Sequence, residues 1–274
     1  MMTTLRTRGY APAVTALAML STVACAPATT TDEDVGEARQ NALIENALIE
    51  NALIENALIE NALIENALIE NALIENALIE NALIENALTD PNARELLKYV
   101  VSCALPADEH IHLTIEGVDY QFDGALGLAP EWGEEGGSCD EDCQSWVSAC
   151  VISRLDYLGQ SVLISLRGKN DGLDTTKAER AAYPNIEATY YGDIFTEPKQ
   201  IFACLPPGKT QIPRVCGPDV SDCVVQIQGN CQNLCGQPRK DGSYPDCREA
   251  PTIKKNGGLK KGEKHVGSVT VFLP

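Results

Sequence analysis

Residues 138–150 read SCDEDCQSWVSAC, and this stretch decides how we expect the second half of the chain to fold. Ser138 is followed three residues later by Glu141, which is the capping-box signal for the start of a helix. The residues that follow keep helical character as far as Leu158. The sequence therefore predicts a helix over residues 138–158.

Cysteine is frequent in this half of the chain, since ten of the eleven cysteines lie between residues 103 and 247. An even number of cysteines in an exported domain predicts a disulfide framework, here of five bridges, whose pairing cannot be read from the sequence. Three of the thiols share one face of the predicted helix, and we expect them to bond to neighbouring strands. The ten cysteines predicted to form bridges are Cys103, Cys139, Cys143, Cys150, Cys204, Cys216, Cys223, Cys231, Cys235 and Cys247.

Short runs rich in β-branched residues or with alternating polarity surround this helix, which is the pattern of strands separated by Gly- and Pro-containing turns. Asp90 followed by Pro91 is the signal for the start of a further helix, ending near Cys103. We therefore predict that residues 91–274 form an α+β domain in which strands dominate and one or two helices occur. The predicted strands cover residues 110–116, 118–122, 161–167, 186–195, 223–227 and 267–273.

Nine identical copies of Asn-Ala-Leu-Ile-Glu occupy residues 41–85, and a degraded tenth copy occupies residues 86–90. A period of five gives no amphipathic stripe on a helix, because the Leu-Ile pairs turn around every side. The helix propensity of Ala, Leu and Glu favours a helical rod. A pentapeptide-repeat β-helix and a disordered chain are the alternatives. In each case we interpret residues 41–90 as a stalk that carries little chemistry.

Residues 1–24 have the composition of an export signal. Two arginines precede an apolar run at residues 11–24 that is too short to span a membrane, and small residues stand before Cys25. This arrangement resembles the bacterial lipobox, which implies that Cys25 is acylated and anchors the protein to the outer membrane or cell surface. Secretion without an anchor is the alternative. Residues 25–40 are interpreted as a flexible tether.

Acidic residues exceed basic ones over the chain, for a formal net charge of −18, and residues 91–274 contain 25 acidic and 18 basic residues. An acidic chain lacks the electrostatic features of a nucleic-acid-binding protein. The one basic cluster surrounds Gly257 and Gly258, and we interpret it as a solvated loop, with contact to an anionic surface as the alternative. Its members are Lys254, Lys255, Lys260, Lys261 and Lys264.

Few residues indicate a metal or catalytic site. His110 and His112 share a face of a predicted strand and are the candidate metal ligands, although a spacing of two residues often arises by chance. Zinc held by cysteine is disfavoured because the short spacings are Cys-x3-Cys. The P-loop, Gly-x-Ser-x-Gly and His-Glu-x-x-His motifs are absent from the sequence, and no cofactor is predicted.

An acidic cluster surrounds Gly136 and Gly137, where calcium would bind weakly, although an acidic first helical turn already accounts for three of its members. These acids are Glu131, Glu134, Glu135, Asp140, Glu141 and Asp142. Aromatic side chains are the other candidates for binding, of a sugar or of a protein, and they are Trp132, Tyr190 and Tyr191. On a regular strand, at most one of the two adjacent tyrosines is expected to be exposed.

The junction between the repeat and the domain reads NALTDP at residues 86–91 and ELLKYVVSCALP at residues 95–106. It resembles uncharacterised exported myxobacterial proteins that carry Asn-Ala-Leu pentads before a cysteine-rich domain. The resemblance covers residues 86–195 and implies no activity. Further motifs that match are GLAP at 127–130, WVSAC at 146–150 and ISLRG at 164–168.

Two functions are consistent with these features. The first is a cell-envelope lipoprotein that displays a disulfide-bonded head on the stalk for adhesion, matrix contact or ligand binding. The alternative is an exported hydrolase whose catalytic carboxylates lie among the 25 acidic residues of the head. A buried acid or histidine with a shifted pKa in a cleft would favour the enzyme. The membrane, reached through a lipid anchor, and a cell-surface or matrix component are the expected partners.

Overall fold

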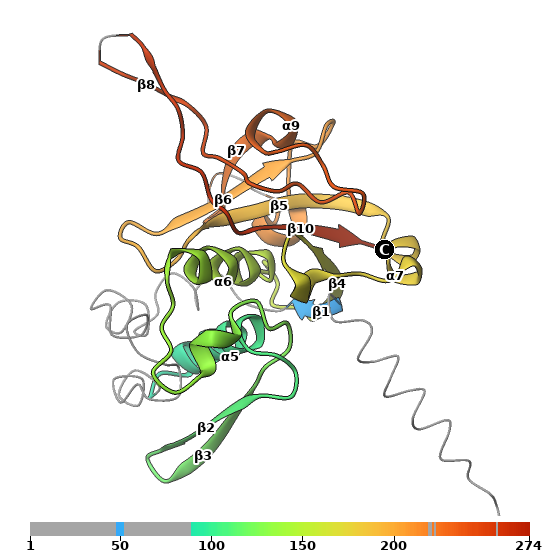
Figure 1. The fold of residues 1–274 in the computed structure, drawn as a ribbon. Helices are drawn as coiled ribbons and strands as arrows, with labels where there is room; N and C mark the ends of the chain where they lie inside the picture. The colour runs from blue at the N-terminus through green and yellow to red at the C-terminus, as the bar shows by residue number, and fades with distance from the viewer. Residues whose placement is uncertain (1–47, 52–88, 219–220, 222, 256) are drawn as a thin grey trace, which may run out of the picture.

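The fold is described by a computed structural model that places residues 48–51, 89–218, 221, 223–255 and 257–274 (Figure 1). The predicted signal peptide, Cys25, the tether and most of the repeat lie outside the described residues. Residues 89–274 form a strand-rich domain with several helices and disulfide bonds, which confirms the predicted disulfide-rich α+β class.

A six-stranded sheet forms the centre of the domain, in the order β1-β4-β10-β5-β6-β7. Its pairs are antiparallel except β6 with β7, which run parallel. The strands are β1 (Leu48–Asn51), β4 (Val162–Arg167), β5 (Asn185–Asp193), β6 (Gln200–Leu205), β7 (Gln226–Asn230) and β10 (Ser268–Leu273). Two hairpins stand apart from this sheet: β2 (His110–Ile115) with β3 (Val118–Asp123), and β8 (Thr252–Ile253) with β9 (Leu259–Lys260).

One segment of the repeat belongs to the sheet. Residues 48–51 pair antiparallel with β4, with Leu48 opposite Ser165 and Asn51 opposite Val162. The backbone of these four residues is therefore extended. The three predicted alternatives for the repeat, a rod, a β-helix or a disordered chain, otherwise concern residues outside the described part.

Five α-helices occur among the described residues, so the expectation of one or two is wrong. The two longest, α5 and α6, are the two that the sequence predicted. The other three span four to six residues each and lack the apolar periodicity that indicates a helix in a sequence. The helices are α5 (Pro91–Ala104), α6 (Glu141–Ser153), α7 (Lys177–Ala182), α8 (Pro213–Cys216) and α9 (Cys231–Leu234).

Helix α6 lies against the sheet and buries ten of its thirteen residues. It contacts β5 and β10 on one face of the sheet, and α5 packs against its other side (Figure 1). The N-cap is Asp140, whose carboxylate accepts from the backbone N–H groups of Asp142 and Cys143. The prediction of Ser138 as the N-cap is therefore wrong, and the helix begins two residues later. The helix ends at Ser153 and not at Leu158.

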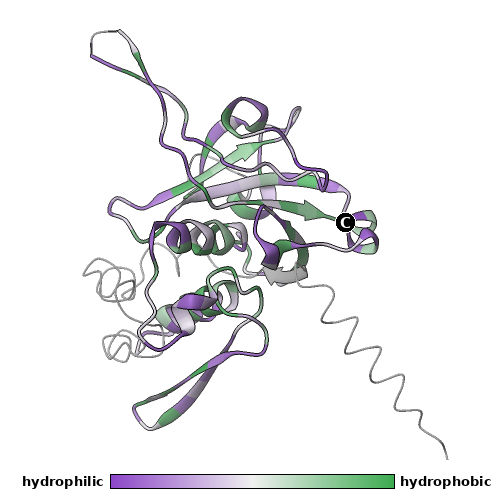
Figure 2. Cartoon of the chain, in the orientation of Figure 1, coloured by the Kyte–Doolittle hydropathy of each residue, from purple (hydrophilic) through white to green (hydrophobic). Residues whose placement is uncertain are grey.

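The opposite face of the sheet carries a second, smaller core. Loops of the C-terminal quarter of the chain and α9 cover this face (Figure 1). The strands at the centre of the sheet are therefore buried on both sides. Figure 2 shows apolar colour on β6 and β10, whereas β5 is pale. The buried members of the second core are Tyr191, Phe202, Cys204, Cys231, Tyr244 and Cys247.

All ten cysteines of the domain form disulfide bonds, which confirms the predicted framework of five bridges. The three thiols predicted to share a helix face do not bond to strands. Cys139, which precedes α6, pairs with Cys143 in its first turn, and Cys150 pairs with Cys103 of α5. The remaining bridges are Cys204–Cys231, Cys216–Cys223 and Cys235–Cys247.

A buried ion pair links α8 to the sheet. The Arg214 guanidinium donates through Nε to Glu187 Oε1 at 2.9 Å and through Nη2 to Ser153 O at 3.0 Å. The hydroxyl of Tyr190 donates to Glu187 Oε2 at 2.9 Å. Burial by itself would lower the pKa of Arg214, but the neighbouring Tyr190 and Glu187 raise it above its usual value. The pair therefore stays charged inside the domain.

Candidate functional site

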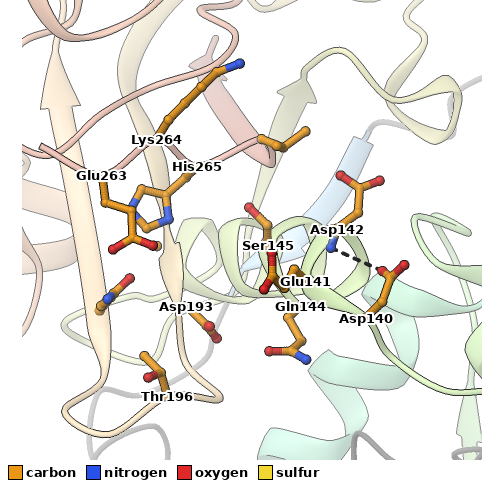
Figure 3. Close-up of a pocket in the computed structure, with 13 residues that line it drawn as sticks. Asp140, Glu141, Asp142, Gln144, Ser145, Asp193, Thr196, Glu263, Lys264 and His265 are labelled. Atoms are coloured by element: carbon orange, nitrogen blue, oxygen red, sulfur yellow. Dashed lines mark hydrogen bonds between the residues drawn. The ribbon is translucent and has the colours of Figure 1, made fainter.

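An acidic cleft of about 670 Å³ opens beside the first turn of α6. Its walls come from three segments far apart in the sequence: the start of α6, the β5–β6 connection and the chain that leads into β10 (Figure 3). Figure 3 shows the first turn of α6 on one side and His265 with Glu263 on the other. Five carboxylates line it: Asp140, Glu141, Asp142, Asp193 and Glu263.

Local structure explains three of these acids. Asp140 caps α6, and Glu141 and Asp142 occupy its first turn, where negative charge interacts favourably with the helix dipole. The Cys139–Cys143 bridge holds this turn covalently. The acidic cluster that the sequence predicted is thus divided, because these three acids line the cleft and the other three do not.

Glycine at position 267 lets the third segment approach α6 closely. The backbone N–H of Gly267 donates to Ser145 Oγ at 2.8 Å. A Cβ at this position would lie 2.4 Å from the backbone carbon of Ser145, so a larger residue would push the two segments apart. This contact sets the spacing between the helix and the chain that carries His265.

Asp193 is the last residue of β5 and lines the cleft. Its Oδ1 accepts from the backbone N–H of Phe195 at 2.8 Å. Burial raises the pKa of Asp193 above its usual value; Glu263 and Glu141 add to the rise, whereas the Phe195 hydrogen bond and His265 oppose it. The carboxylate is therefore harder to ionise than an exposed aspartate, and a cation beside it would favour the charged form.

His265 is the buried base of the cleft, with 6% of its surface exposed. Its ring packs against Tyr191 and Phe202, with centroids 5.6 and 5.9 Å away. Nε2 lies 3.7 Å from the Glu249 carboxylate and has no hydrogen-bond partner in the described part of the chain. Burial lowers the pKa of His265, against the influence of Glu249, Glu263 and Asp193. The imidazole is therefore neutral at neutral pH.

The charges of the cleft are unbalanced. Lys264 is its one cationic side chain among the described lining residues, and Nζ of Lys264 pairs with Asp246 at 3.1 Å. Uncharged donors and acceptors complete the lining, among them Gln144, Thr196 and Gln200. No side-chain hydroxyl among the described residues hydrogen-bonds to His265, so the cleft shows no assembled pair of nucleophile and base. The net negative charge of these lining residues favours a positively charged group in the cleft.

The aromatic residues predicted for binding lie elsewhere. Trp132, Tyr190 and Tyr191 are the largest fully buried side chains among the described residues, so they offer no surface to a ligand. The two tyrosines point to opposite faces of β5, as alternation requires, but both faces of this strand are covered. Neither tyrosine is exposed, which agrees with the expectation of at most one, because the second core covers the face to which Tyr191 points.

The two predicted histidines share one face of β2, and in the described part of the chain they belong to no group of three potential metal ligands. His110 and His112 are exposed on β2, with ring centroids 4.7 Å apart. Among the described residues, the one group of three potential metal ligands is Cys204, Cys231 and Cys235. Their sulfurs are joined in disulfide bonds and are not thiolates.

The buried histidine predicts a pH dependence of stability. Because the folded pKa of His265 lies below the usual 6.5, the unfolded chain takes up the proton first. The contribution of His265 to stability is fully present above pH 6.5 and is lost as the pH falls toward the folded pKa. Urea titrations between pH 7.5 and 5 should show a shallower loss of unfolding free energy in His265→Phe than in the wild type. Equal slopes would contradict a neutral, buried imidazole.

Sequence did not point to this site. No motif in the sequence distinguishes His265 from the other two histidines, or Asp193 and Glu263 from the other acids of the domain. The signal that would have found them is spatial, since residues 140–145, 193–200 and 263–266 meet only in the folded domain. None of the helices in the described part is long and apolar enough to cross a membrane.

Comparison with known proteins adds no further assignment. No protein family matches the chain, and neither a curated protein nor a solved structure is similar to it.

Proposed function

We propose that the protein is exported and tethered to the cell envelope through acylated Cys25, and that its head is a binding module that captures a cationic ligand in the acidic cleft. Five disulfide bonds in one domain support export, because such bonds persist outside the reducing cytosol. The repeat then serves as the connection between anchor and head.

The observation that carries the binding proposal is the set of five carboxylates around one cleft. Their negative potentials add in a space partly screened from water, which favours a cation. Asp193 adds to the attraction for a cation. Burial has removed part of the water around its carboxylate, and a bound cation would take the place of that water. Amines and guanidinium groups of basic peptides and polyamines have the required charge and hydrogen-bond donors.

Calorimetric titration of the oxidised protein with spermidine or trilysine tests this proposal. We expect binding that weakens with salt, and a loss of about tenfold in affinity in the double variant Asp193→Asn, Glu263→Gln, for two charges removed. Asparagine at 193 can still accept the Phe195 hydrogen bond, which limits the change to charge.

The control for this experiment is Asp108→Asn, which removes one exposed negative charge that is not part of the lining of the cleft. Its affinity for spermidine should match the wild type. Equal affinity in all three proteins, or preferential binding of triglutamate, would refute the proposed cation-binding site.

A second function is supported by the opposite pKa shifts of two residues in the same cleft. A carboxyl group that stays protonated to higher pH and an imidazole that stays neutral are the states needed for a general acid and a general base. If the protein is an exported hydrolase, Asp193→Asn should lower turnover of glycan or peptide substrates by about 100-fold or more. Binding of cationic probes with no turnover would decide for the binding module.

A further inference from the structure

The β8–β9 hairpin projects away from the domain and contacts little of it (Figure 1). Its two short strands pair Thr252 with Lys260 and Ile253 with Leu259. The backbone N–H of Lys254 donates to Gly258 O at 2.7 Å, which closes the loop between the strands. The hairpin is thus a projection whose two strands are joined by backbone pairing.

An apolar pair stands at the end of this hairpin. Ile253 is 78% exposed and Leu259 is 71% exposed, the two highest values among the large apolar side chains of the described residues. The two residues lie directly opposite each other on antiparallel strands, so their side chains share one face. Figure 2 shows a mainly hydrophilic hairpin with an apolar stretch near its tip.

Positive charge surrounds the apolar pair. Residues 250–262 contain four lysines and no acid, in a chain of net charge −18. All four are exposed, and within the described residues none of them forms an ion pair. They are Lys254, Lys255, Lys260 and Lys261. The sequence interpretation of a solvated loop accounts for the lysines but not for the exposed Ile253 and Leu259.

We propose that the β8–β9 hairpin docks on the surface of an anionic phospholipid bilayer. In this arrangement Ile253 and Leu259 enter the boundary between headgroups and acyl chains, and the lysines contact the lipid phosphates. The apolar pair favours a bilayer over nucleic acid or a soluble phosphate, neither of which would bury two aliphatic side chains. The docking is independent of the acidic cleft and of acylation at Cys25.

Flotation with vesicles tests the docking. The mature chain from residue 25 onward with Cys25→Ser, which lacks the apolar export signal and cannot be acylated, should bind vesicles of phosphatidylcholine mixed with phosphatidylglycerol and should dissociate as salt is raised. The double variant Ile253→Asp, Leu259→Asp should bind about tenfold less. Replacing Lys254 and Lys255 with glutamine should lower binding to the anionic vesicles by a similar factor.

The matched control is Val118→Asp, at the turn of the β2–β3 hairpin, where an apolar residue is 52% exposed without neighbouring lysines. Its vesicle binding should equal that of the Cys25→Ser parent. A tryptophan at position 253, in Ile253→Trp, should shift its emission to shorter wavelength when the anionic vesicles are added.

Three outcomes would overturn the proposal. The first is the absence of binding to phosphatidylglycerol vesicles. The second is unchanged binding in Ile253→Asp, Leu259→Asp. The third is tight binding to duplex DNA or heparin that this double variant leaves intact, since that result would identify a general polyanion site.

Discussion

Replacing Arg214 with methionine is expected to lower the free energy of unfolding by about 3–5 kcal/mol, because it leaves the Glu187 carboxylate buried without a counter-ion. The side chains of Arg214 and Glu187 are only 9% and 4% exposed. Arg214 also donates to the carbonyls of Ser153 and Leu155, so the connection after α6 loses its partner as well. Urea denaturation at pH 7 measures the loss.

The double variant Arg214→Met, Glu187→Gln separates the cost of the unpaired buried carboxylate from the cost of the lost packing. Removing both charges should recover part of the stability, since the remaining polar groups cost less to bury than a carboxylate. A cost below about 1 kcal/mol for Arg214→Met, equal to that of the double variant, would show that the ion pair does not hold α8 against the sheet.

Removing the disulfide between α5 and α6, in Cys103→Ala, Cys150→Ala, is expected to cost about 4 kcal/mol, because this bridge closes a long loop in the unfolded chain. The two cysteines are 47 residues apart. The bridge also joins the two longest helices, so its loss should loosen α5 and the β2–β3 hairpin that packs against it.

Cys139→Ala, Cys143→Ala provides the matched control. All four cysteines are at most 2% exposed, but this second pair is separated by only 4 residues. The entropy of loop closure then predicts a cost of about 2 kcal/mol. Thermal and urea denaturation of both variants measure the difference, and equal losses would contradict the loop-length argument.

Strong local signals made part of the fold predictable. Asp90 accepts from the N–H of Asn92 and Pro91 stands at the first helical position, as expected for α5. The hairpin of β2 and β3 and the strands β4, β5 and β10 also lie where alternation and β-branched residues place them. In these elements the local preference of the chain agrees with its tertiary surroundings.

Tertiary contacts decide the elements that the sequence did not predict. Residues 200–205, QIFACL, form β6 although they show no alternation, because this strand is covered on both faces. The strand expected at 223–227 begins only at Gln226, since Cys223 is held in a bridge to Cys216. Disulfide pairing and the cleft depend on which distant segments meet in space, and local sequence patterns do not indicate these contacts.

The proposed binding of cations in the acidic cleft is tested most directly by an NMR titration of the histidine side chains. The chain has three histidines, so the imidazole spectrum separates His265 from His110 and His112. Adding spermidine to the oxidised protein should shift the His265 resonances and lower its pKa further, because a cation in the cleft opposes protonation, while the two β2 histidines stay unchanged. Shifts confined to His110 and His112, or an unmoved His265 at saturating spermidine, would contradict the assignment of the cleft.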